Sequence, residues 1–96
     1  MQKYRRKENP DFVVEAVQLT KANVREVAEW CIGKEIEETD AMDSSIKYVG
    51  LNLLTVVEGI RRASEGDFVV QDVIGGFHVR WPDNFLRDFE EVNDGE

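Results

Sequence analysis

The chain has 96 residues, which is enough for one domain with one core, so we expect a single domain over residues 1–96. A hydrophobic fraction of 42% and a charged fraction of 33% are typical of globular proteins, whereas a formal net charge of −8 argues against binding along the phosphate backbone of a nucleic acid. The one cysteine, Cys31, excludes an internal disulfide and a cysteine-based metal cluster. The sequence has neither the run of about 18 apolar residues that a membrane span requires nor a signal peptide, so we expect a cytoplasmic protein without a cofactor or a membrane partner.

The first third of the chain predicts a charged arm, a strand and a helix. Residues 1–10 predict a basic arm that a proline ends, and we expect it to be frayed or to lie at the edge of a sheet with its charges solvated. The alternative is that these charges contact an anionic partner. Residues 12–19 are largely apolar on both faces, which favours an interior strand. Thr20 is a candidate N-cap for a helix over about residues 21–32, which would end at a left-handed Gly33. The buried stripe of that helix consists of Val24, Val27, Ala28 and Cys31.

An acidic segment follows the predicted helix. The carboxylates within residues 35–43 are Glu35, Glu37, Glu38, Asp40 and Asp43. Their spacing lacks the Asp-x-Asp-x-Asp-Gly pattern of an EF-hand loop, so we expect a solvated loop and no metal site. Residues 46–54 then predict a strand with a bulge or a close backbone approach at Gly50 and a reversal near Asn52. The face of this strand that we expect to be buried carries Lys47, Val49, Leu51 and Leu53.

A turn within residues 63–70 organises the second half of the chain. Gly66 allows the positive φ of this turn, and the side chain of Asp67 caps it. The flanking β-branched and apolar residues predict a three-strand meander, whose last two strands meet at the turn of Gly75 and Gly76. The three strands cover residues 55–62, 68–73 and 77–81.

The end of the chain predicts a short helical or irregular segment and a last strand. Residues 81–87 predict a turn at Pro82 followed by this segment, which Asp83 or Asn84 can cap. Residues 89–92 form the last strand, and residues 93–96 form an acidic tail that we expect to be frayed. Together these elements predict an α+β fold, in which one main helix packs on a small antiparallel sheet of about five strands.

No catalytic constellation is visible in the sequence, so we expect no enzymatic activity. His78 is the only histidine, and without a second histidine or a positioned serine or cysteine it fits neither a catalytic triad nor a zinc site. In its strand it shares a polar face with Arg80. The candidate binding residues are Tyr48, Arg61, Arg62, His78, Arg80 and Trp81.

Several motifs resemble those of a widespread group of small phage and prophage proteins of unknown function. Residues 4–7 and 13–20 are similar to the start of that group, Y-R-[KR]-K … V-x-V-E-A-x-Q-[WL]-T. The second half resembles its P-G-D-[YWF]-[IV]-[IV] turn, its Gly-containing turn before an aromatic strand, and its P-D-x-F … [YF]-E ending. The matching segments of the second half are residues 64–70, 75–77, 82–85 and 89–90. Glu65 stands where the group has proline, which should loosen the turn slightly.

The resemblance implies a phage-encoded accessory protein in the cytoplasm of a bacterial host, and it carries no activity across. Our main hypothesis is therefore a non-enzymatic binding module that engages a host protein. Its candidate contact surface is the polar face of Arg61, His78 and Arg80, together with the acidic segment at residues 35–43. Pairing of exposed edges at the terminal strands is compatible with a homodimer.

Two other functions are compatible with the sequence. The protein could sequester an anionic nucleotide signal of host immunity, with Arg61, Arg62 and Arg80 on the phosphates. Tyr48 or Trp81 would then stack on the base. Alternatively, the acidic surface could imitate DNA and occupy a DNA-binding protein.

Overall fold

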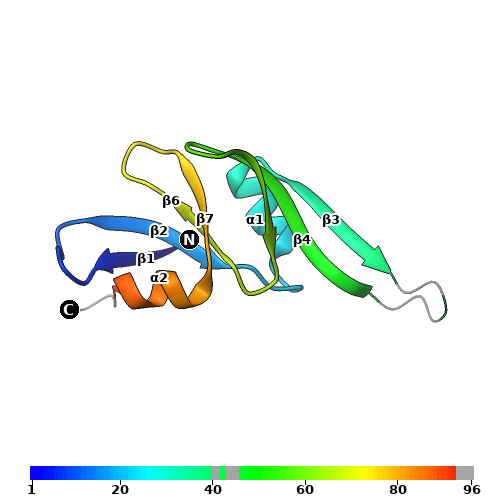
Figure 1. Ribbon diagram of the computed structural model, residues 1–96, viewed down its shortest axis with the longest axis horizontal. Coiled ribbons are helices and arrows are strands. Elements are labelled where there is room, and N and C mark those ends of the chain that lie inside the picture. Colours follow the sequence, from blue (N-terminus) through cyan, green and yellow to red (C-terminus); the bar gives the residue numbers. More distant parts are fainter. Residues whose placement is uncertain (40–41, 43–45, 93–96) are drawn as a thin grey trace.

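The computed structural model describes residues 1–39, 42 and 46–92, and within them the chain forms eight strands and two helices (Figure 1). The strands are β1 (Gln2–Arg6), β2 (Val13–Gln18), β3 (Lys34–Thr39), β4 (Ile46–Thr55), β5 (Gly59–Ser64), β6 (Phe68–Gln71), β7 (Phe77–Arg80) and β8 (Phe89–Glu91). The helices are α1 (Val24–Cys31) and α2 (Pro82–Asp88). One sheet has five strands in the order β7-β6-β2-β1-β8, the other has three in the order β3-β4-β5, and every pair is antiparallel. The α+β class is confirmed, although three of the strands form a second sheet and α2 is a second helix.

Both faces of the five-stranded sheet carry buried side chains, since successive side chains of a strand point to opposite sides. On one face, Val69 and Val79 pack with α1 and with the buried side of the three-stranded sheet. On the other face, an aromatic cluster gathers around Phe85 of α2. This second cluster contains Val14, Ala16, Phe68, Val70, Phe85 and Phe89, with Tyr4 and Phe12 packed against it. The short helix α2 therefore covers only part of its face of the sheet (Figure 1).

The basic segment at the start of the chain is not a frayed arm or an edge. Its residues 2–6 form β1, which pairs with β2 on one side and with β8 on the other. Successive side chains of β1 point to opposite faces of the sheet. Tyr4 points toward Phe68 and Phe85, with ring centroids 5.9 and 4.9 Å away. Arg5 turns the other way and donates from Nε to Glu90 on β8 at 2.8 Å. Of the charges that suggested a solvated arm, Arg5 is thus paired with an acidic neighbour, and the edges of this sheet are β7 and β8.

The first part of the expected acidic loop is a strand. Lys34–Thr39 form β3, which pairs with β4 as an outer strand of its sheet, where charged side chains can stay solvated. Asp40 and Asp43 lie outside the described residues. The irregularity in pairing lies between Glu38 and Thr39 and not at Gly50, which is in register with residues of both neighbouring strands.

The reversal after β4 also differs from the expectation. The strand passes Asn52 and turns after Thr55, whose hydroxyl donates to the carbonyl of Gly59 at 2.7 Å and accepts from the N–H of Glu58 at 3.2 Å. The expected burial of Val49, Leu51 and Leu53 is confirmed, whereas the side chain of Lys47 lies outside the described part of the structure. The side-chain hydroxyl of a threonine thus sets this turn.

The turn at Gly66 is confirmed, but the meander around it is wrong. Gly66 has φ +96°, and Oδ2 of Asp67 accepts the backbone N–H of Ser64 at 2.9 Å. The strands on either side belong to different sheets, because β5 pairs with β4 whereas β6 pairs with β2 and β7. Leu19, just after β2, exchanges backbone hydrogen bonds with Gly66 and Asp67 at 2.8 Å each. The end of β2 therefore holds the turn and places β6 beside β2.

The ends of α1 differ from the expected caps. The helix begins at Val24, and the N-cap residue is Asn23, which exchanges hydrogen bonds with Thr20 in the preceding turn. The left-handed residue at the other end is Ile32, with φ 55°, instead of Gly33. Gly33 is needed for space, because a Cβ there would lie 2.8 Å from the carbonyl oxygen of Asn52.

The turns around β7 serve two different purposes. Gly75 has φ +94°, whereas Gly76 needs its small size because a side chain there would meet Val56 of the β4–β5 turn. Pro82 is the first residue of α2, and Trp81 precedes it as an extended N-cap without a side-chain hydrogen bond. The expected cap by Asp83 or Asn84 is therefore wrong.

Candidate functional site

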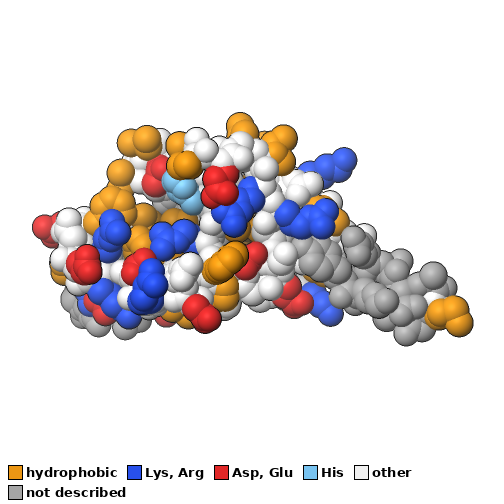
Figure 2. Space-filling model, viewed as in Figure 1, with side chains coloured by type: hydrophobic (Ala, Val, Ile, Leu, Met, Phe, Trp, Pro, Cys, Tyr) orange, Lys and Arg blue, Asp and Glu red, His pale blue; other side chains and the backbone are white. Residues whose placement is uncertain are grey.

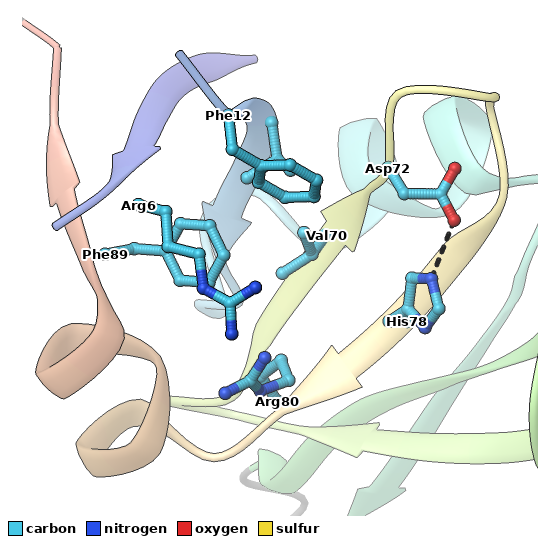
Figure 3. Close-up of a pocket in the computed structure, with 8 residues that line it drawn as sticks. Arg6, Phe12, Val70, Asp72, His78, Arg80 and Phe89 are labelled. Atoms are coloured by element: carbon cyan, nitrogen blue, oxygen red, sulfur yellow. Dashed lines mark hydrogen bonds and ion pairs between the residues drawn. The ribbon is translucent and has the colours of Figure 1, made fainter. Parts of the chain in front are cut away.

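A cavity of about 180 Å³ opens on the five-stranded sheet beside α2. Its residues come from β1, β2, β6, β7 and β8 and from the turns next to them, so five separate segments of the chain build it (Figure 3). The lining residues are Arg6, Phe12, Val14, Val70, Asp72, His78, Arg80 and Phe89. We call this the sheet pocket.

The floor of the sheet pocket is apolar. Val14 and Val70 lie on the neighbouring strands β2 and β6 and are only 4% and 6% exposed. The rings of Phe12 and Phe89 form the walls, with their centroids 6.4 Å apart. A ligand group that reaches the floor is therefore surrounded by hydrocarbon, where an unpaired charge is costly.

Two guanidinium groups lie at the mouth of the sheet pocket. The Cζ of Arg6 lies 5.8 Å from the centre of the Phe12 ring and 6.0 Å from that of Phe89, and the Cζ of Arg80 lies 5.9 Å from the Phe89 ring. Arg80 donates to Asp88 at 3.1 Å. In the part of the chain that the structure describes, no carboxylate pairs with the guanidinium of Arg6. Arg6 is therefore a cation held over an aromatic surface with its donors available.

The surroundings of the mouth are basic although the protein is acidic. Lys7 donates from Nζ to the carbonyl of Leu86 on α2, and it lines a small hollow with Arg6, Glu8, Arg87 and Asp88. Hydrogen bonds from Arg87 and then Arg80 lower the pKa of Asp88. Figure 2 shows Lys and Arg side chains around exposed hydrophobic surface on this face. We call Arg6, Lys7, Arg80 and Arg87 the basic cluster.

The opposite side of the mouth is closed by Asp72 and His78. Oδ2 of Asp72 lies 2.8 Å from Nε2 of His78, and Oδ1 accepts the backbone N–H groups of Ile74 and Gly76 at 3.0 and 2.9 Å (Figure 3). The hydrogen bond from His78 and then those from the backbone hold the pKa of Asp72 below its usual range. Because an ionised carboxylate only accepts, Nε2 carries the hydrogen. The pair therefore ties the β6–β7 turn to β7.

The other residues singled out from the sequence lie in a second, more open hollow or away from it. Arg61, Arg80 and Trp81 line a hollow of about 290 Å³ with Glu58, with which Arg61 forms an ion pair. Arg62 follows Arg61 on β5 and points to the opposite face of the sheet. The expected triad of phosphate-binding arginines is thus not brought together. The side chain of Tyr48 lies outside the described part of the structure.

Of the eight residues that line the sheet pocket, the sequence predicted His78 and Arg80 as binding residues and missed the other six, which are Arg6, Phe12, Val14, Val70, Asp72 and Phe89. The signal that could have found Arg6 is its position two residues after Tyr4 in the first segment. Taken as a strand, that segment puts Arg6 on the same face as Tyr4, which is an aromatic core residue. Phe89 pairs with Arg6 across β1 and β8, a contact between distant parts of the chain that no local pattern indicates.

Neither α1 nor α2, the helices of the described residues, is long and apolar enough to cross a membrane. No group of three or more His, Cys, Asp or Glu side chains that could hold a metal ion occurs among the residues described. No protein-family model matches the chain, and comparison with curated proteins and with solved structures also gave no match.

Proposed function

We propose that this chain is a phage-encoded accessory protein that works as a non-enzymatic binding module and engages a protein of the host bacterial cytoplasm through the sheet pocket. The observation that carries the proposal is the pairing of an apolar floor with the guanidinium of Arg6, which has no carboxylate partner in the described structure. The phage origin rests on the resemblance of the motifs described above.

The chemistry of the sheet pocket supports binding over catalysis. His78 is engaged with Asp72, and no serine, threonine or cysteine lines the pocket. Cys31 lies in the core on the other side of the five-stranded sheet, and burial raises the pKa of its thiol. A nucleophile activated by a base is therefore missing from this group of residues.

The two alternative functions have less support. The sheet pocket of about 180 Å³ lies below the range of roughly 300–1,000 Å³ that is usual for small-molecule sites. In the second hollow, Arg61 and Arg80 each already hold a carboxylate, with which a nucleotide phosphate would have to compete. A DNA mimic would present acidic groups, whereas the face with the pocket presents the basic cluster.

The proposal can be tested by affinity capture from host lysate with mass spectrometry. We expect the tagged protein to retain one host protein in stoichiometric amount, and Arg6→Glu to lose it, because the substitution reverses the charge at the mouth. Arg25→Glu is the matched control, since Arg25 is an exposed arginine on α1, away from the pocket. The purified host protein must then rebind the wild type and not Arg6→Glu. Equal capture by both variants, or a co-purifying nucleotide in place of a protein, would contradict the proposal.

A further inference from the structure

The sheet pocket is apolar at its floor and positively charged at its mouth. Val14 and Val70 at the floor are almost fully buried, whereas Arg6 at the mouth is exposed to solvent. Figure 3 shows the guanidinium groups of Arg6 and Arg80 on the Phe89 side of the pocket, away from the backbone of the floor. A ligand that fits both the floor and the mouth must insert an apolar group into the pocket and keep its anionic group at the mouth.

This order discriminates between the anionic groups of a protein. An internal aspartate or glutamate enters a pocket tip first, and its carboxylate would lie against Val14 and Val70, where desolvation is costly. The last residue of a chain is different, because its α-carboxylate and its side chain leave the same carbon atom. Its side chain can enter the pocket while its carboxylate stays at the mouth beside Arg6.

We propose that the sheet pocket binds the C-terminal residue of the partner protein, with a compact apolar side chain against Val14 and Val70 and the α-carboxylate on the guanidinium of Arg6. This inference rests on the proposed function and names the part of the partner that is recognised. A small carboxylic acid with a compact apolar group shares this chemistry, and the test below separates the two sources.

The size and the charges of the pocket fit such a ligand. The cavity of about 180 Å³ corresponds to roughly six water molecules at about 30 Å³ each, which suits one aliphatic side chain such as leucine. The planar fork of a guanidinium matches a carboxylate, and such hydrogen bonds are stronger than neutral ones. Because Arg80 is already bound by Asp88, Arg6 is the main anchor and Arg80 adds charge. The basic cluster attracts an anion that the rest of the acidic surface would repel.

Titration followed by ¹⁵N-resolved amide NMR spectra tests the inference with three probes. The first is a short peptide that ends in leucine with a free carboxylate, the second is the same peptide with a C-terminal amide, and the third is N-acetyl-leucine. We expect the free-carboxylate peptide to shift the amide signals of Val14, Val70 and Phe89, with a dissociation constant at or below the millimolar range. The amide-terminated peptide should bind at least about tenfold more weakly.

Two matched variants show whether Arg6 is the anchor. Arg6→Gln should lower the affinity for the free-carboxylate peptide at least about tenfold, whereas Arg25→Gln should leave this affinity unchanged. Equal weakening by both variants, equal binding of the acid and the amide, or no shift at the pocket residues would overturn the inference. If N-acetyl-leucine binds and the peptide does not, the site is one for small carboxylic acids, and the inference is also overturned. If the peptides do not bind but capture of a host protein still depends on Arg6, the proposed function is supported and only the recognition of a C-terminal residue is contradicted.

Discussion

The carboxylate of Asp72 lies 2.8 Å from Nε2 of His78 and also accepts two backbone N–H groups of the turn after β6. We expect Asp72→Asn to lower the free energy of unfolding at neutral pH by about 1–3 kcal/mol, because an amide oxygen replaces a charged acceptor. Urea unfolding at neutral pH measures this change. Asp11→Asn, at an exposed turn, is the control and should change stability by less than about 0.5 kcal/mol.

The same pair predicts a dependence on pH. Since the pKa of Asp72 is lowered in the folded state, its contribution to stability is present above the ordinary carboxyl pKa of about 4 and is lost as the pH falls through the lowered value. The wild type should therefore lose more stability on acidification than Asp72→Asn does. Unfolding curves for both proteins at neutral and acidic pH test this. Parallel loss of stability in both would show that the carboxylate contributes nothing to the pH dependence.

Phe85 is the centre of the aromatic cluster under α2. It is fully buried and contacts Tyr4, Phe68 and Phe89 with ring centroids 4.4–4.9 Å away. Phe85→Ala should lower the free energy of unfolding by about 3–5 kcal/mol, because it removes buried surface and leaves a cavity. This is a large part of the stability of a small domain. Leu86→Ala is the neighbouring control, because Leu86 is 48% exposed, and it should cost much less. Chemical denaturation compares the two, and similar losses would mean that α2 is not held through Phe85.

Features set by local chemistry could be predicted from the sequence, and features set by distant contacts could not. The turn at Gly66 needs only a residue that tolerates positive φ, and the buried stripe of α1 needs only helical spacing. The separation of β5 from β6 into two sheets depends on Leu19, far away in sequence, which holds the turn. In the pocket, the polar face of β7 was predicted, whereas Arg6 and Phe89 meet only because β1 and β8 pair.

Ile32 adopts a conformation that β-branched residues disfavour. Its φ is 55°, and its side chain is 90% exposed, so little burial offsets the strain. We expect Ile32→Asn to stabilise the protein by up to about 1 kcal/mol, because asparagine tolerates the left-handed region. Ile74→Asn is the control at another exposed isoleucine, one without a positive φ. Melting temperatures measure both variants, and equal effects would show that the change reflects lost surface hydrophobicity alone.

The backbone at the end of β1 and just after it should be protected from hydrogen exchange. The N–H of Arg6 donates to the carbonyl of Phe12 and that of Lys7 to Asp88, each at 2.9 Å. Both amides should exchange much more slowly than those of an unstructured peptide, as NMR-detected exchange can show. Exchange at the unstructured rate would favour a frayed basic arm.

The pairing of β1 with β8 has a consequence for how the protein is made. Arg5 and Glu90 are 85 positions apart, so the ribosome completes β1 long before its outer partner exists. Until then β1 can pair only with β2 and leaves its other edge unpaired, which is the kind of edge that invites aggregation. Such long-range closure also slows folding, because the entropy of a large loop is lost before the contacts form. The aromatic wall at Phe89 and the mouth at Arg6 can therefore come together only after Phe89 has been synthesised.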